Sequence, residues 1–289
     1  MRPLVAGIDI GGTNTVIGLV TNEGDILKES TIFTRNHASF KEYIQVIADQ
    51  INELLQKLEG ANSLIGIGIG APNGSNRLGG INNAPNLAWK GFLPLADELN
   101  KFFDVPIRVI NDARAAALGE LLFGAGVGLK HFIVITLGTG LGGGIVVNGE
   151  ILLGDDEQAG ELGHTIVKTN GRLCGCGKKG CLETYVSATG ICRTALKIIA
   201  NYNCKQSTLS QLPFKNITAK RIADAAKEGD TIAKETFEYT GRILGTKLSD
   251  FVATLNPEAI ILTGGLANAG GLIIDPTQRH MEANLFPMY

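Results

Sequence analysis

The chain has 289 residues, and its 26 basic and 28 acidic side chains give a formal net charge of −2. It is 44% hydrophobic and 19% charged, which excludes a disordered protein and leaves enough apolar material for two domains. Because no run of Lys or Arg stands out and no apolar run reaches the length of a membrane span, we expect neither nucleic acid nor a membrane as a partner.

The N-terminal region predicts strands separated by a glycine loop. Residues 4–10 form an apolar, β-rich run, which the segment GGTN at 11–14 separates from a second apolar run at 15–20. Backbone N–H groups in such a loop can bind a phosphate, and Asp9 beside it could orient Mg²⁺ or its waters. For this loop taken alone, a plain hairpin is the alternative.

The next elements are a helix and a buried strand. Ser39 and Glu42 form a capping-box pattern ahead of apolar residues at helical spacing, which predicts a core-facing helix up to Gly60. Residues 64–70 predict a strand buried on both faces. The loop that follows is rich in Asn, including Asn86; these amides either cap turns or bind sugar hydroxyls.

A further strand, at 105–110, places Asn111 and Asp112 at its carboxyl end, directly before an Ala-rich helix at 113–123. Open α/β sheets bind their ligands at such strand ends. The alternative is that Asp112 only caps the helix.

The first hairpin has a counterpart later in the chain. A predicted strand at 132–137, a glycine loop at 138–144, a strand at 145–147 and a turn repeat the order of residues 5–27. Two related α/β halves, each with a hairpin that can bind phosphate, predict one nucleotide held between them.

A cluster of cysteines follows. Cys174, Cys176 and Cys181 lie within eight residues, and His164 precedes the first of them by ten positions. Three thiolates and one imidazole are the usual ligands of a structural zinc site. The spacing differs from the C-x-x-C of dithiol enzymes, and buried cysteines in a glycine-rich loop are the alternative.

Two acidic residues flank this cluster. Glu161 and Glu183 are not needed to complete the metal's ligands, so the loop could present them, with His164, to a polyol. Taken alone, they could equally be solvated acids. The other two cysteines, Cys192 and Cys204, are predicted to be free thiols, and we expect a cytoplasmic protein.

The last third predicts a long helix capped by Asp230 and ended by Asn256 and Pro257, then a strand at 259–262. The glycine pair after this strand would let an adenine or ribose approach the backbone.

Five segments carry a family resemblance: DIGGTN, INDARAAALGE, LGTGLGGGI, the stretch from ELGH to GCLE, and ILTGG. In this order they resemble the ROK family of bacterial sugar kinases and sugar-responsive repressors, over essentially the whole chain. The resemblance implies a duplicated actin-like, ribonuclease-H-like α/β fold, with domains at 1–115 and 116–289 that flank an active-site cleft. It also implies ATP, Mg²⁺ and transfer of the γ-phosphoryl group to a hexose hydroxyl.

By position, Asp112 resembles the family's catalytic base, and His164 would contact both sugar and zinc. The residues implied to bind ATP and its phosphates are Asp9, Gly11, Gly12, Thr13, Asn14, Gly138, Thr139, Gly140, Gly264 and Gly265. The residues implied to bind the sugar are Gly74, Asn86, Asn111, Asp112, Glu161, His164 and Glu183. The implied zinc ligands are His164, Cys174, Cys176 and Cys181.

We expect a glucokinase, with N-acetylhexosamine kinase and fructokinase as alternatives, and a homodimer or higher homo-oligomer. The rival function is a sugar-responsive transcriptional regulator. The family's regulators carry a helix-turn-helix segment ahead of the first glycine loop; here that loop begins at Gly11, which leaves no room for one and disfavours a regulator. Arg114 and Asn73 depart from the family pattern, and the family's closing helix is expected beyond Tyr289, where this chain ends. Arg114 and the missing closing helix keep a sugar-binding pseudokinase as a further alternative, whereas Asn73 could shift the sugar preference.

Overall fold

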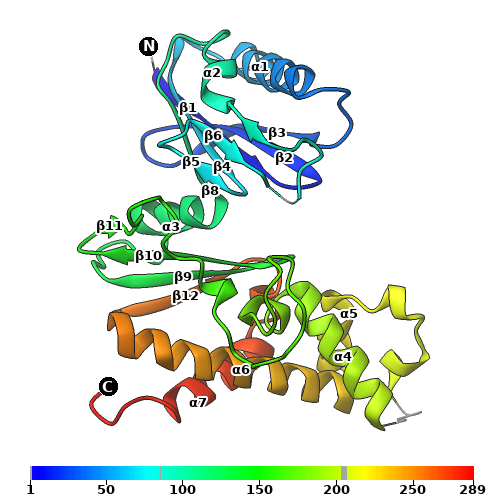
Figure 1. Ribbon diagram of the computed structural model, residues 1–289. Coiled ribbons are helices and arrows are strands. Elements are labelled where there is room, and N and C mark those ends of the chain that lie inside the picture. The colour runs from blue at the N-terminus through cyan, green and yellow to red at the C-terminus, as the bar shows by residue number, and fades with distance from the viewer. Residues whose placement is uncertain (1, 85, 203–206) are drawn as a thin grey trace. The chain divides into compact units, whose positions relative to one another are not determined.

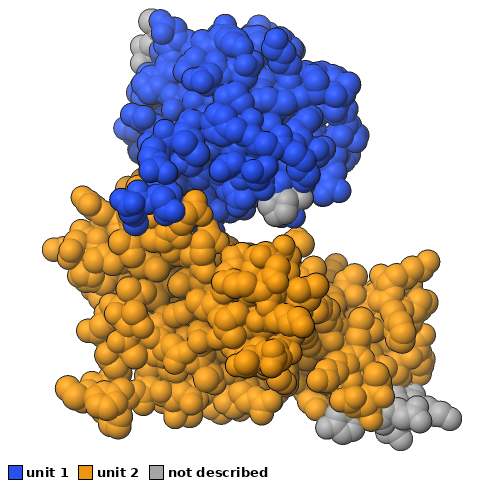
Figure 2. Space-filling model, in the orientation of Figure 1, with its two compact units in different colours: residues 1–119, 154–157 blue, residues 120–153, 158–289 orange. Residues whose placement is uncertain are grey.

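The computed structural model describes residues 2–84, 86–202 and 207–289. The chain forms two compact units (Figure 2). Unit 1 comprises residues 1–119 and 154–157, and unit 2 comprises residues 120–153 and 158–289. The boundary expected between residues 115 and 116 stays a prediction. Cys204 lies outside the described residues, whereas Cys192 is a free thiol.

Unit 1 is built on a five-stranded mixed sheet with the order β3-β2-β1-β4-β8 (Figure 1). Its strands are β1 (Arg2–Ile10), β2 (Asn14–Val20), β3 (Ile26–Phe33), β4 (Asn62–Ala71) and β8 (Ile107–Asn111). The first three strands form an antiparallel meander, whereas β4 and β8 run parallel to β1. The carboxyl ends of β1, β4 and β8 therefore lie at one edge of the sheet.

Helix α1 (Phe40–Gln56) begins as the capping pattern predicted, because the hydroxyl oxygen of Ser39 accepts a hydrogen bond from the Glu42 N–H at 3.2 Å. Its apolar face is buried in the core of unit 1 with the sheet. Helix α3 (Asp112–Phe123) confirms the Ala-rich helix predicted at 113–123. A three-stranded sheet and one short helix were not predicted. These elements are β5 (Gly74–Ser75), β6 (Gly80–Asn82), β7 (Phe92–Leu93) and α2 (Leu95–Leu99).

Unit 2 repeats the strand pattern of unit 1. Its sheet has the order β11-β10-β9-β12, with β9, β10 and β11 antiparallel and β12 parallel to β9. The strands are β9 (Phe132–Leu137), β10 (Leu141–Val147), β11 (Glu150–Ile151) and β12 (Ala259–Thr263). This correspondence with β1–β4 agrees with the predicted duplication.

The prediction of a glycine loop at 138–144 is wrong in its second half. Gly142, Gly143 and Gly144 belong to β10 and pair with β9. A Cβ on Gly143 would lie 2.6 Å from the Gly160 carbonyl oxygen, so the glycine allows a close packing contact rather than a loop.

Helices cover the sheet of unit 2, and the longest, α6 (Thr231–Leu255), runs along one face (Figure 1). Asp230 caps it as predicted, accepting a hydrogen bond from the Ala233 N–H at 3.1 Å, and Asn256 ends it in the left-handed conformation. The other helices are η1 (Leu162–His164), η2 (Leu182–Thr184), α4 (Ala188–Tyr202), η3 (Thr208–Gln211), η4 (Phe214–Asn216), α5 (Ala219–Lys227), η5 (Ala267–Ala269) and α7 (Gly271–Glu282). Among the described residues, no helix combines the length and the apolar character that crossing a bilayer requires.

Candidate functional site

The predicted base lies at the junction of β8 and α3 in unit 1. Asn111 caps the helix: its amide oxygen accepts hydrogen bonds from the N–H groups of Ala113 at 3.0 Å and Arg114 at 3.3 Å. Asp112 Oδ1 also accepts one from Ala113, at 2.8 Å. Both residues therefore bind N–H groups at the start of α3, and the role of Asp112 as a base stays a prediction beside the capping alternative.

The electrostatics of this junction involve two carboxylates and a buried Arg. Water reaches the side chains of Asp112 and Asp9, but the protein atoms around each carboxyl raise its pKa. The negative charge of Asp112 raises the pKa of Asp9 further. In Asp112, the Ala113 N–H and then the Arg114 guanidinium oppose the rise. Arg114 is 2% exposed, so its charge acts from within the protein.

Two other predicted sugar ligands of unit 1 lie near these segments. Gly74 is buried in β5, and a Cβ there would lie 2.5 Å from the Ile110 carbonyl oxygen, directly before Asn111. Asn86 lies against the first glycine loop, because a Cβ on Gly12 would approach the Asn86 carbonyl oxygen to 3.0 Å. That loop is closed by a hydrogen bond from the Gly11 N–H to the Asn14 carbonyl at 2.9 Å.

In unit 2, the second glycine loop is held by the start of α4. The N–H of Ala188 donates to the Gly138 carbonyl at 2.9 Å, and the Thr189 hydroxyl donates to the Thr139 carbonyl at 3.0 Å. Gly264, with φ of 91°, packs against Leu137 at the end of β9. The structure thus brings Gly138–Gly140 and the glycine pair after β12 to one edge of the sheet.

Glu183 connects this loop to the cysteine cluster. Its Oε2 accepts a hydrogen bond from the Leu141 N–H at 3.0 Å, and Oε1 lies 3.5 Å from Cys174 Sγ. Glu161 is exposed directly before η1, and its carbonyl accepts from the His164 N–H at 3.1 Å. Glu183 therefore has defined partners on two sides, whereas Glu161 presents its side chain to solvent.

The four predicted metal ligands come together. One ligand atom from each of His164, Cys174, Cys176 and Cys181 lies within 4.8 Å of the others. The Cys176 and Cys181 sulfurs are 3.7 Å apart, close to the ~3.8 Å that tetrahedral geometry gives for Zn–S bonds of about 2.3 Å. Burial raises the pKa of Cys174 to about 12, so a cation would be needed to hold it as a thiolate. This group can hold a metal ion.

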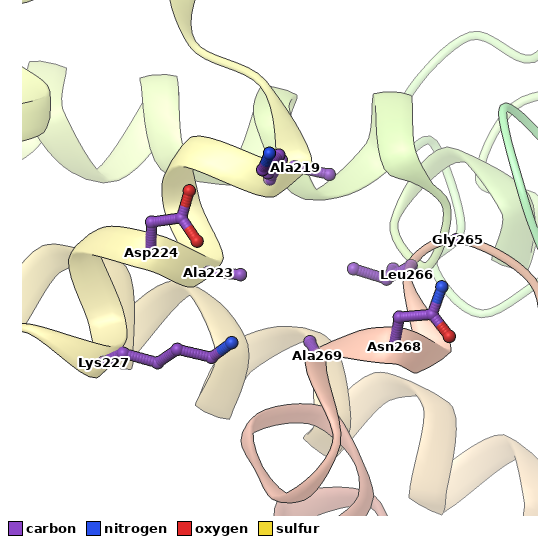
Figure 3. A pocket seen from close by; sticks show the side chains of 9 residues that line it. Ala219, Ala223, Asp224, Lys227, Gly265, Leu266, Asn268 and Ala269 are labelled. Atoms are coloured by element: carbon purple, nitrogen blue, oxygen red, sulfur yellow. The ribbon is translucent and has the colours of Figure 1, made fainter.

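A pocket in unit 2 extends beyond Gly265 (Figure 3). Its volume is about 310 Å³, and Lys227 and Asn268 lie on either side of it. The lining residues are Ala219, Lys220, Ala223, Asp224, Lys227, Gly265, Leu266, Asn268 and Ala269. Only Gly265 was predicted. The polar residues of α5 look like an ordinary solvated helix face in the sequence, so no signal there pointed to a pocket.

Comparison with known proteins decides the family. The ROK family model matches residues 5–287. This chain belongs to the ROK family. It is 39% identical over 284 residues to a glucokinase of Halalkalibacterium halodurans, a match that covers 97% of this chain and 86% of that protein.

Solved ROK structures share the fold. A Streptomyces griseus ROK glucokinase in complex with glucose and AMPPNP superimposes with a TM-score of 0.81 at 35% identity, covering 98% of this chain and 90% of that one. A ROK transcriptional regulator, a homolog of the Escherichia coli MLC protein, gives a TM-score of 0.87 at 28% identity and covers 100% of this chain but 72% of its own. These matches confirm the predicted ROK family and its duplicated α/β fold. The roles of individual residues stay predictions.

The contact between the second glycine loop and Glu183 gives a testable prediction. A Cβ on Gly140 would overlap Glu183 Oε2, whereas a Cβ on Gly138 would meet no atom within 4 Å. The carboxylate can rotate away, so we expect Gly140→Ala to cost about the loss of its hydrogen bond with the Leu141 N–H, about 0.5–1.5 kcal/mol. Gly138→Ala is the matched control, and its free energy of unfolding should stay near the wild-type value. Equal denaturation midpoints for the two variants would contradict the contact.

Proposed function

We propose that this ROK protein is an ATP-dependent hexose kinase that transfers the γ-phosphoryl group of ATP to the 6-hydroxyl of glucose. The observation that carries the proposal is its 39% identity with a glucokinase over nearly its whole length. The resemblance of its fold to a glucokinase that binds glucose and AMPPNP supports the same two substrates.

In unit 1, Asp112 would accept the proton of the attacking hydroxyl. A general base needs to be ionised and within hydrogen-bond reach of the hydroxyl, and its place at the carboxyl end of β8 suits this task. Asn111 would contact the sugar while its amide oxygen caps α3. Mg²⁺, when bound with ATP, would neutralise phosphate charge, and Asp9 beside the first glycine loop is the residue that could hold its waters.

In unit 2, Gly138–Gly140 would bind phosphate through backbone N–H groups, and the pocket beside Gly265 would receive the adenosine. Lys227 and Asn268 could donate hydrogen bonds there. Glu161, His164 and Glu183 would bind the sugar's ring hydroxyls. We propose Zn²⁺ as the metal of the three cysteines and His164; with its four positions filled, it would orient these residues rather than take part in the chemistry.

The test is a coupled assay with ATP, Mg²⁺ and a panel of hexoses. We expect kcat/KM to fall in the order glucose, N-acetylhexosamines, fructose, because a hydrogen-bonding site discriminates against analogues that leave its polar groups unpaired. An N-acetylhexosamine preferred by tenfold or more would overturn the choice of glucose but not the kinase. Binding of a hexose without turnover would instead favour a regulator or pseudokinase.

A cytoplasmic homodimer or higher oligomer remains our expectation for the assembled protein.

The raised pKa of Asp112 predicts the pH dependence of the reaction. Because the base must be ionised, kcat/KM should fall as the pH drops through a pKa above the usual Asp value of about 3.9. Arg114→Gln removes a charge that lowers this pKa, so the acid limb should move to higher pH, and Arg114→Lys should largely preserve it. Arg108→Gln, at an exposed position of β8, is the control. An acid limb that does not move in Arg114→Gln would contradict the assignment.

A further inference from the structure

Glu157 lies in the segment between β11 and η1 and has an unusual backbone conformation. Its φ is 60°, in the left-handed region that long side chains rarely adopt. Such a conformation persists where the surroundings fix it. Here the surroundings are specific: the Ser75 hydroxyl donates to Glu157 Oε2 at 2.6 Å, and the Arg77 N–H lies 3.2 Å from both carboxylate oxygens.

The charge around Glu157 favours its ionised form. Partial burial raises the pKa of this carboxyl, but hydrogen bonds from Ser75 and from the N–H groups of Arg77 and Asn76, together with the charge of Arg114, hold it below the usual value. Hydrogen bonds to an ionised acceptor are stronger than neutral ones. Ser75 is itself 6% exposed, so this acceptor satisfies a buried hydroxyl.

Ser75 and Glu157 both lie close in the chain to predicted sugar ligands. Ser75 follows Gly74, which packs against the strand end that carries Asn111. Glu157 is the last residue of unit 1 in its segment; the chain continues into unit 2 and reaches Glu161 four residues later. The carboxylate of Glu157 therefore holds in place the residue that precedes the segment leading to Glu161.

We propose that Glu157 is a positioning residue for hexose binding, because its bonds to Ser75 and Arg77 fix the residue from which the chain leads on to Glu161 and His164. The inference rests on the proposed kinase function, since it assigns Glu161 and His164 to the sugar. It adds a residue that touches neither substrate in this scheme and acts through the loop that it holds.

The test compares Glu157→Gly, Glu157→Gln and Ser75→Ala. Glycine accepts the left-handed backbone but removes the carboxylate, so we expect the KM for glucose to rise about tenfold, as for the loss of a hydrogen bond to a charged group. The KM for ATP should change less than about twofold, since the ATP groups lie on other segments. Glu157→Gln keeps acceptor oxygen and shape and should recover most of the affinity.

A double variant and a control separate the anchor from general damage. If Glu157 and Ser75 act through their mutual bond, adding Ser75→Ala to Glu157→Gly should change the KM for glucose little further. Asp156→Asn removes an exposed carboxylate from the neighbouring position and should behave as wild type. Fully additive effects, or an unchanged KM for glucose in Glu157→Gly, would overturn the proposal.

Hydrogen exchange gives a readout that needs no activity. Backbone amides at 152–160 should exchange faster in Glu157→Gly and Ser75→Ala than in Asp156→Asn. Unchanged exchange in Glu157→Gly would overturn the anchor even in an active enzyme. A wild-type protein that phosphorylates no hexose would overturn the proposed function. Faster amide exchange in its Glu157→Gly and Ser75→Ala variants would still support the anchor.

Discussion

Replacing Asp112 with Asn is expected to lower kcat for glucose by about 10²–10⁴-fold, the usual contribution of a general base. Asn keeps the shape of the side chain and its oxygen can still accept the Ala113 hydrogen bond, so the start of α3 should remain intact. The amide cannot take up a proton. The loss should therefore appear in turnover rather than in the dissociation constant for glucose.

Steady-state kinetics and calorimetric titration with glucose measure the two quantities separately. Asp104→Asn is a matched control, because Asp104 is an exposed carboxylate just before β8, at the opposite end of the strand from Asp112. It should retain normal turnover. An Asp112→Asn variant with turnover close to wild type would show that another group accepts the proton.

Replacing Cys176 with Ser is expected to release the metal and to destabilise unit 2. A metal bound only by the folded state stabilises that state, and removing one of four ligands leaves buried thiols without their cation. We expect a loss of about 3–5 kcal/mol, which corresponds to a fall in melting temperature of about 10 °C for a unit of this size.

Metal analysis by mass spectrometry should find one zinc per chain in the native protein and close to none in the variant. Cys192→Ser is the control, since Cys192 is a partly buried free thiol on α4 outside the cluster. It should keep both the zinc and the melting temperature. Native protein that contains no zinc and still has a normal melting temperature would contradict the metal assignment.

The elements that sequence reasoning predicted well are those with local signals. Ser39 and Asp230 cap α1 and α6 through side chains a few residues from their partners, and alternation of glycine loops with apolar runs predicted both hairpins. The start of β10 could not be predicted in this way. Gly143 pairs with Ile135 of β9 and lets Gly160, distant in sequence, pack against it, and a glycine run alone does not reveal such contacts.

Contacts between residues distant in sequence also limit how much of the candidate site could be predicted. The metal ligands could be predicted because their chemistry is distinctive and their spacing is short. The burial of Arg114 beside Asp112, the pocket lining from α5 and the bond between Glu157 and Ser75 depend on residues brought together by the fold. The polar and charged side chains involved are of types that are usually solvated, so their sequence context gives no indication of these contacts.

The assignment of residues 154–157 to unit 1 has a consequence for biosynthesis. A ribosome releases residues 1–119 first, but the acceptor for the Ser75 hydroxyl arrives only after β9 and β10 have been translated. The N-terminal unit of the nascent chain therefore reaches its final hydrogen bonding only once the first hairpin of the following unit has emerged. A released fragment ending at Gly119 lacks this acceptor, so it should be more susceptible to proteolysis than the same residues in the whole chain.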